Sequence, residues 1–240
     1  MEAEIKLLIP TAQAFDAILS HVKAHEAPRP KLWQNNTFFD SESGALRAVD
    51  FSVRVRRECH LGHAGLTTGP SEVDPGRIVV TLKGPKQRSD EGAEKLSLRS
   101  LVVRPEEEVV VDAAALGGGD LLALLPPSAL VSRARDALGG AALRRHESFV
   151  NVRTSVPWKF ETEAGAIDVV LELDATTFVD GDREETQHEC EVELPPARAA
   201  ELAGPVAAAL KKLLEEAGGE PVKPAKGKRS RCRAFLKAGR

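Results

Sequence analysis

The chain has 240 residues, of which 42% are hydrophobic and 29% charged, and its formal net charge is −3. This length fits one domain or at most two small ones, and the balanced charge by itself excludes no class of partner. No apolar stretch approaches the roughly 20 residues of a membrane-spanning helix, and the N-terminus has no secretory signal pattern. The 3 cysteines are widely spaced and suggest no disulfide framework. These features favour a soluble cytoplasmic protein without a membrane partner.

The predicted elements alternate between runs of strands and single helices. Residues 1–9 alternate charged and apolar side chains, which predicts a strand, and Thr11 then begins a helix with apolar residues at helical spacing. The later segments follow by the same criteria. Strands are expected at 33–39, 46–57, 77–83, 94–104, 144–155, 157–162, 166–174 and 186–194, helices at 106–139 (interrupted) and from Pro196 to 217, a flexible loop at 59–76 and a basic segment at 221–240.

About eight strands in hairpin order, with helices at the joints, predict an α+β fold. The expected architecture is an eight-stranded antiparallel β-barrel with helices packed at its outside and ends. One domain, spanning residues 1–240, is expected.

Several of the predicted strands carry their charged residues on one face. The charged residues at alternate positions are Glu2, Glu4 and Lys6; Arg54 and Arg56; Glu172 and Asp174; and Glu189, Glu191 and Glu193. Two carboxylates on one face of a strand lie about 7 Å apart, a distance that suits ligands of hydrated divalent ions. A charged face is more often the solvated face of a half-buried sheet. Periodicity alone does not decide which face lies inside.

The order of these segments resembles that of the CYTH superfamily, the triphosphate tunnel metalloenzymes, and is most similar to the short single-domain tripolyphosphatase branch. The opening Glu2-Ala3-Glu4-Ile5-Lys6 matches its ExExK signature. The other matching segments are Asn36-Thr37-Phe38-Phe39-Asp40 (NTFFD), Arg54-Val55-Arg56 (RxR), Leu82-Lys83-Gly84 (the lysine strand), Phe149 to Arg153 (the central arginine strand), Leu171 to Asp174 (the acidic strand) and Glu189-Cys190-Glu191 (ExE).

The resemblance implies a barrel open at both ends, whose polar tunnel binds a triphosphate together with Mg²⁺ or Mn²⁺. The residues expected to bind phosphate oxygens are Lys6, Arg54, Arg56, Lys83, Arg153 and Arg231. The expected metal ligands are Glu2, Glu4, Asp174, Glu189 and Glu191, and Glu4 and Glu191 are also the expected catalytic residues. One metal would neutralise the phosphates, and another would activate a water molecule for in-line attack.

The chain departs from the family pattern at two places. Arg231, four residues before Phe235, stands where the family has a lysine, and it keeps the positive charge. In the strand expected after Lys83, Glu94 is followed on its face by Leu96 where many members have a second acidic residue. The second departure predicts a weakened metal site or an altered substrate.

The leading functional hypothesis is hydrolysis of inorganic triphosphate (tripolyphosphate) to diphosphate and phosphate. Thiamine triphosphatase is an alternative, but few aromatic residues are present to hold the thiamine rings, Trp33, Trp158 and Phe160 being the candidates. Adenylate cyclase would need purine contacts that the sequence does not reveal. A non-catalytic module that binds polyphosphate is the alternative from another class. The expected partner is tripolyphosphate or an organic triphosphate, bound by a monomer, and nucleic acid is not expected.

Overall fold

The computed structural model describes residues 1–61, 76–86, 101–162 and 165–239. These residues form two compact units, which are described separately. Unit 1 comprises Met1 and the described parts of 32–86 and 104–151, and unit 2 comprises those of 2–31, 87–103 and 152–240. Within the described residues, no helix is long and apolar enough to cross a membrane.

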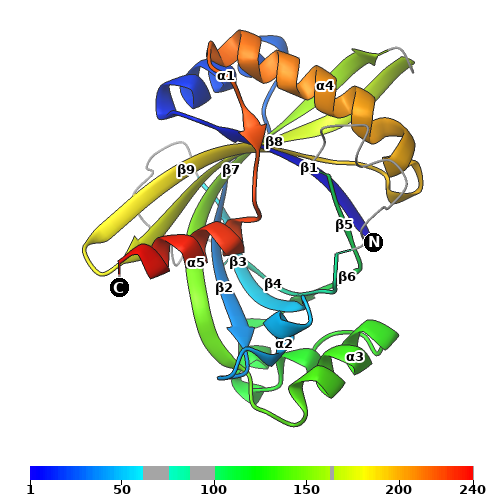
Figure 1. Cartoon of the computed structure of the whole chain (residues 1–240), viewed down its shortest axis with the longest axis vertical. Helices are drawn as coiled ribbons and strands as arrows, with labels where there is room; N and C mark the ends of the chain where they lie inside the picture. The colour runs from blue at the N-terminus through cyan, green and yellow to red at the C-terminus, as the bar shows by residue number, and fades with distance from the viewer. Residues whose placement is uncertain (62–75, 87–100, 163–164, 240) are drawn as a thin grey trace. The chain divides into compact units, whose positions relative to one another are not determined.

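The described strands follow the hydrogen-bonded order β10-β1-β9-β8-β7-β2-β3-β4-β6, with β5 paired to β1 (Figure 1). The neighbouring pairs β1–β10, β1–β9, β2–β3, β3–β4, β4–β6 and β8–β9 are antiparallel. The strands are β1 (Glu2–Ile9), β2 (Leu32–Asp40), β3 (Ser52–His60), β4 (Arg77–Lys83), β5 (Leu101–Arg104), β6 (Glu106–Val111), β7 (Arg144–Thr162), β8 (Gly165–Asp180), β9 (Arg183–Glu193) and β10 (Lys223–Pro224).

The helices belong to one unit or the other. Unit 1 contains α2 (Ala45–Ala48), α3 (Ala129–Leu138) and the 3₁₀ helices η1 (Ala113–Gly118) and η2 (Leu121–Ala123). Unit 2 contains α1 (Ala12–His25), α4 (Ala199–Gly218), α5 (Lys228–Ala238) and the 3₁₀ helix η3 (Pro196–Arg198). The predicted α+β class and the antiparallel pairing expected of the barrel are confirmed, although ten strands rather than eight are found in the described residues.

Several predicted boundaries were wrong. Residues 106–111 are a strand and not the start of a helix, and the predicted strands 144–155 and 157–162 are one continuous strand, β7. The predicted strand at 46–57 begins only at Ser52, after the short helix α2. Of the loop expected at 59–76, Cys59 and His60 belong to β3, and 62–75 lie outside the described residues.

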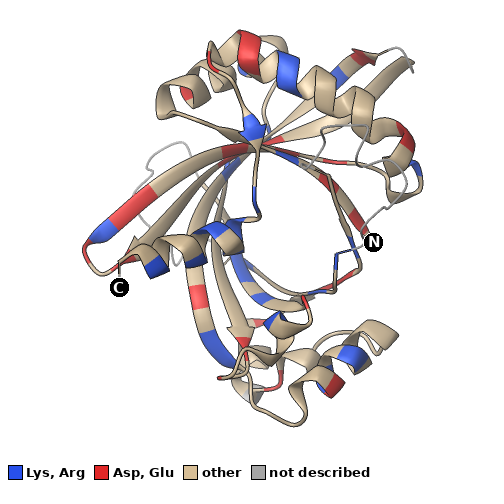
Figure 2. Cartoon of the chain, in the orientation of Figure 1, with Lys and Arg blue, Asp and Glu red and all other residues tan. Residues whose placement is uncertain are grey.

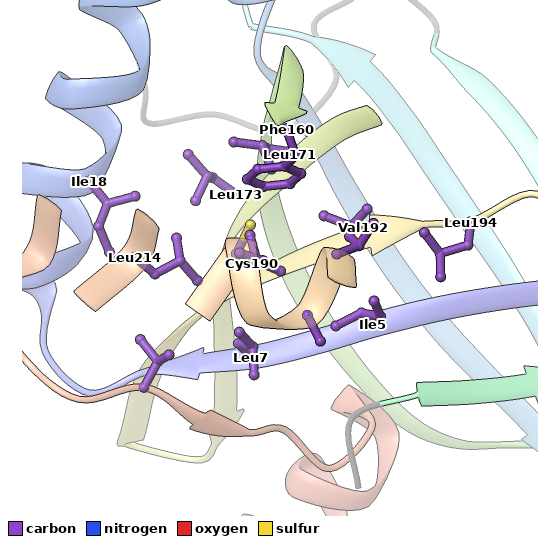
Figure 3. Packing of buried hydrophobic residues seen from close by; sticks show 14 of the residues in the cluster. Ile5, Leu7, Ile18, Phe160, Leu171, Leu173, Cys190, Val192, Leu194 and Leu214 are labelled. Atoms are coloured by element: carbon purple, nitrogen blue, oxygen red, sulfur yellow. The ribbon is translucent and has the colours of Figure 1, made fainter. Parts of the chain in front are cut away.

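The core of unit 2 lies between one face of its strands and the helices α1 and α4. Apolar residues of β1, β8 and β9 pack against apolar residues of these two helices (Figure 3). The labelled contributors include Ile5 and Leu7 from β1, Leu173 from β8, and Ile18 and Leu214 from the helices. Burial of this face explains the alternation in the sequence, because every second strand residue enters the core.

The core of unit 1 follows the same principle. Val53 and Val55 of β3, together with Val80 and Leu82 of β4, pack against buried leucines of α2, η2 and α3. The residues between them, which include Arg54 and Thr81, therefore point to the opposite face. In both units the helices cover the apolar face, so the charged side chains gather on the face that these helices do not cover.

Asp40, the last residue of the NTFFD segment, has a structural role. Its side chain is 1% exposed. One carboxylate oxygen accepts hydrogen bonds from the backbone N–H groups of Ser41 and Leu46, at 2.8 and 2.9 Å, and the other accepts from Arg47 at 3.0 Å. Asp40 thus satisfies the backbone donors of the turn that leads into α2.

Candidate functional site

Strand register places the acidic and basic residues of unit 2 in adjacent rows. Lys6 on β1 lies opposite Glu191 on β9, and Glu191 lies opposite Glu172 on β8. Two residues along the ladder, on the same face, Asp174 lies opposite Glu189. Residues directly opposite each other in an antiparallel pair are close enough for their side chains to interact. The register therefore brings carboxylates from two strands beside a lysine from a third.

Lys6 forms two ion pairs in this cluster. Its Nζ lies 2.8 Å from Oε2 of Glu4 and 2.5 Å from Oε1 of Glu191. The Lys6 side chain is only 12% exposed. Burial alone would lower the pKa of Lys6, but the carboxylates of Glu191, Glu4 and Glu189 outweigh this effect and hold the pKa well above its ordinary value. Lys6 is therefore a permanently charged member of the cluster.

Arg153 on β7 binds carboxylates of two acidic strands, the adjacent β8 and, beyond it, β9. Its Nε and Nη2 donate to the two carboxylate oxygens of Asp174, at 2.8 and 2.6 Å. Nη2 also donates to Glu191 at 2.6 Å, and Nη1 forms an ion pair with Glu172. The planar guanidinium suits this role, because it presents several donors in fixed directions.

Helix α5 supplies two further basic residues to the same carboxylates. The Nζ of Lys228 lies 2.8 Å from Asp174 and 2.8 Å from Glu191, and it also forms an ion pair with Glu189. Arg231, one helical turn later, forms an ion pair with Glu189 through Nη2. The acidic stretches of β9 and the basic residues of α5 are visible in Figure 2.

The carboxylates of Asp174, Glu189 and Glu191 fit a divalent cation. One oxygen from each lies within 4.8 Å of the others, and all three residues are buried. Carboxylate oxygens are the ligands that hard divalent cations such as Mg²⁺ prefer. The donor set is thus chemically suited to such an ion.

The pKa values of these carboxylates are driven apart by their surroundings. Burial opposes ionisation of Glu191, but Lys228, Lys6 and Arg153 overcome it and hold its pKa well below the usual range. Arg153 and Lys228 likewise outweigh burial and lower the pKa of Asp174. For Glu189, burial dominates and raises the pKa, and the adjacent negative charge of Glu191 adds to the effect.

A second polar cluster lies on β3, β4 and β6 of unit 1. Nη2 of Arg54 donates to the hydroxyl oxygen of Thr81 at 3.2 Å, and Nε of Arg56 lies 2.6 Å from Glu58. The Thr81 hydroxyl donates in turn to Glu108 at 3.1 Å. Arg54 and Arg56 share a face of β3, as the alternation predicted, and Lys83 lies on the same face as Thr81, the partner of Arg54 on β4.

Strand β6, which pairs with β4, carries Glu106 and Glu108 at alternate positions. Glu106 lies opposite Lys83, with its carboxylate 3.4 Å from the lysine Nζ, and Glu108 lies opposite Thr81. The strand expected at 94–104 is present in its described part as β5, whereas the strand that pairs with β4 is β6. Glu94 and Leu96 lie outside the described residues. The predicted effect of Leu96 therefore stays a prediction.

Unit 2 brings most of the predicted site residues together. Glu4, Lys6, Arg153, Asp174, Glu189, Glu191 and Arg231 are joined by the ion pairs described above. Glu2 begins β1, two residues before Glu4. Arg231 faces Glu189 in this structure, so its predicted phosphate contact stays a prediction. The same applies to the catalytic and metal-binding roles.

Four charged residues of these clusters were not predicted as site residues, namely Lys228, Glu106, Glu108 and Glu172. A sequence signal points to the first three. Lys228 lies three residues before Arg231, the spacing of neighbours on one helix face. Glu106 and Glu108 alternate before the β-branched run Val109 to Val111, which favours a strand. Glu172 was seen to share a face with Asp174, but no role was assigned to it.

The protein has an antiparallel α+β fold with a charged face, on which buried carboxylates are interleaved with lysine and arginine. Such a face is suited to binding cations together with a polyanion. The chain matches the CYTH domain over residues 1–222 and belongs to that family. No protein of curated function matches the sequence.

Solved structures support the same fold. One is an adenylyl cyclase candidate from Hippeastrum described as having a dominant triphosphatase activity, with a TM-score of 0.65, 24% identity, and coverage of 100% of this chain and 97% of that one. An adenylate cyclase candidate from Bacillus halodurans has a TM-score of 0.56 at 16% identity, covering 96% of each chain. A protein from Pyrococcus horikoshii OT3 has a TM-score of 0.53 at 17% identity, covering 100% of both.

Proposed function

We propose that this protein hydrolyses inorganic triphosphate to diphosphate and phosphate in a reaction that depends on a divalent cation. The observation that carries the proposal is the buried set Asp174, Glu189 and Glu191, surrounded by Lys6, Arg153 and Lys228. Carboxylates at this density need cations, and basic side chains at this density suit a strongly charged anion.

The carboxylates of unit 2 are the proposed cation ligands, with Glu2 and Glu4 as further ligands on β1. Mg²⁺ or Mn²⁺ is the proposed ion, because the donors are all carboxylate oxygens. When bound, such an ion supplies positive charge that offsets the negative charge of the phosphate oxygens during transfer. The role of the chain is to hold the carboxylate oxygens at fixed positions on rigid strands.

The basic residues are proposed to bind phosphate oxygens. Arg153 and Lys6 are held on strands, and each contacts carboxylates through several donors, so their positions are set before any ligand arrives. Pre-positioned donors lower the reorganisation required in the transition state. Arg54, Arg56 and Lys83 in unit 1 are proposed to serve the same purpose.

Membership of the CYTH family and the triphosphatase activity described for the Hippeastrum protein support hydrolysis of a triphosphate. Tripolyphosphate is proposed over thiamine triphosphate because the described contacts of the site are formed by charged groups. Glu106 and Glu108, which lie beside Lys83 and Thr81, support a catalytic site over a non-catalytic binding module.

The test is phosphate release from tripolyphosphate, ATP and thiamine triphosphate by the full chain, each with Mg²⁺, Mn²⁺ or EDTA. The proposal predicts that tripolyphosphate is cleaved fastest and that EDTA abolishes cleavage. A preference for thiamine triphosphate or ATP would retain the reaction class and refute the proposed substrate. Absence of phosphate release with every metal, while tripolyphosphate still binds, would refute the enzymatic function.

A further inference from the structure

The ammonium group of Lys228 lies at the centre of the three carboxylates that suit a divalent cation. It contacts an oxygen of Asp174 and an oxygen of Glu191, at 2.8 Å each, and forms an ion pair with Glu189. These are the same three residues whose oxygens lie within 4.8 Å of one another. A lysine ammonium and a metal ion cannot both occupy this position.

We propose that Lys228 is a built-in competitor for the divalent cation, which must displace the lysine side chain from Asp174, Glu189 and Glu191 in order to bind. The proposal rests on the proposed function only in taking these carboxylates as the cation site. It concerns the exchange of one cation for another and requires no change of protonation.

Helix α5 holds Lys228 in place through contacts that do not involve the lysine. The ring of Phe235 lies 6.1 Å from that of Phe178, which is fully buried on β8. Arg183 stacks over Phe235, with its guanidinium carbon 4.6 Å from the ring centre. Because these contacts lie two turns beyond Lys228, the lysine side chain can leave the carboxylates while the helix stays on β8.

Lys228 is suited to exchange because its charge sits on a flexible four-carbon stem. Its competitors for the carboxylates are held more firmly. Arg153 binds Asp174 through two nitrogens, and Arg231 also donates to the backbone oxygen of Lys226 at 2.9 Å and to Gln187 at 2.7 Å. Of these basic groups, Lys228 is therefore the one we expect a metal ion to replace.

The exchange couples cation binding to anion binding. In the structure, the positive charge of Lys228 is used to neutralise carboxylates. A divalent ion takes over that task, and the released ammonium becomes available to a phosphate oxygen. Lys228 thus lowers the cation affinity of the protein alone and favours joint binding of cation and triphosphate.

The first test is calorimetric titration of the full chain with Mn²⁺, without any phosphate compound. Lys228→Met removes the competing charge and is expected to bind Mn²⁺ at least tenfold more tightly than the wild type. Lys237→Met removes the same charge from an exposed position of α5 and is expected to stay within twofold. Equal or weaker binding by Lys228→Met would overturn the proposal, as would absence of Mn²⁺ binding by all three proteins.

The second test uses the wild type and so does not depend on the folding of a variant. Acetylation of each lysine by acetic anhydride is followed by peptide mass spectrometry, with and without Mn²⁺. Mn²⁺ should increase the modification of Lys228 several-fold and leave that of Lys237 unchanged. Unchanged or reduced modification of Lys228, under conditions where Mn²⁺ is bound, would overturn the proposal. Neither test measures hydrolysis, so a failure of the proposed reaction remains distinguishable.

Discussion

Arg153 binds Asp174 through two parallel hydrogen bonds, from Nε and Nη2, at 2.8 and 2.6 Å. The two residues come from neighbouring strands, and the Asp174 side chain is fully buried. A buried carboxylate is tolerated only where cations compensate for its lost hydration. This pair therefore contributes both to the charge balance of the site and to the stability of unit 2.

The substitution Asp174→Asn is expected to lower the free energy of unfolding by about 3 kcal/mol, because it leaves Arg153 and Lys228 buried without one of their carboxylates. Urea unfolding of the metal-free protein measures the change. Asp168→Asn on the same strand is the control. Asp168 is 82% exposed and pairs with Lys159 at 3.5 Å, so its loss should change stability by less than about 0.5 kcal/mol. Equal effects of the two substitutions would contradict the role given to Asp174.

Removal of the β6 carboxylates should reduce turnover without unfolding the protein. Glu106→Gln combined with Glu108→Gln is expected to slow phosphate release from tripolyphosphate by about tenfold or more, because it removes acidic groups beside Lys83 and Thr81. Glu107→Gln is the control, because Glu107 lies between these two residues on the opposite face of the strand. It should retain activity within about twofold, and a comparable loss in both proteins would argue against a specific role for this face.

Asp40→Ala should destabilise unit 1, since three backbone donors lose their acceptor. The expected loss is about 3 kcal/mol in the free energy of unfolding. Asp136→Ala, at an exposed position of α3, should change it by no more than about 0.5 kcal/mol. Thermal unfolding of both variants provides the measurement. If Asp40→Ala unfolds like the wild type, the NTFFD aspartate has another purpose.

His188 gives the metal-free protein a pH-dependent stability. Burial, which outweighs the opposing effect of Asp16, lowers the pKa of His188, and its ring lies 4.6 Å from that of Phe15. The unfolded chain therefore binds a proton at higher pH than the folded chain does. Stability contributed by the neutral ring is present above the unfolded pKa of about 6.5 and is lost as the pH falls toward the lower folded value.

The substitution His188→Gln should flatten this part of the stability profile. Urea unfolding at intervals between pH 7.5 and 5 is expected to show a smaller loss of stability on acidification than in the wild type. His21→Gln, at an exposed position of α1, serves as the comparison. An unchanged slope in His188→Gln would show that other groups govern this pH range.

The sequence predicted the charged faces correctly because alternation along a strand is a local property. It could not show which face the helices cover, since that depends on where α1 and α4 pack. The residues Glu106 to Glu108 were assigned to a helix, because glutamate favours helices when considered alone. Pairing with β4 overrides that preference, and the β-branched run that follows these residues is the local signal of a strand.

The spacing of Lys228 and Arg231 places them on one helix face, but the carboxylates that they contact could not be predicted locally. The sequence showed a basic C-terminal segment, but the partner of each basic residue depends on how α5 docks on β8. The contact between Phe235 and Phe178, which are 57 residues apart in the sequence, fixes that docking. Long-range packing of this kind leaves no periodic signal.

The most direct test of the central claim measures phosphate release from tripolyphosphate across a Mn²⁺ titration. It compares the wild type with Glu191→Gln and with Glu184→Gln, an exposed position on the same strand. We predict that Mn²⁺ stimulates phosphate release by the wild type and by Glu184→Gln. In Glu191→Gln, the rate of metal-stimulated release should be lower by about a hundredfold or more. Equal metal-stimulated release by all three proteins would contradict the assignment of the buried carboxylates as the catalytic cation site.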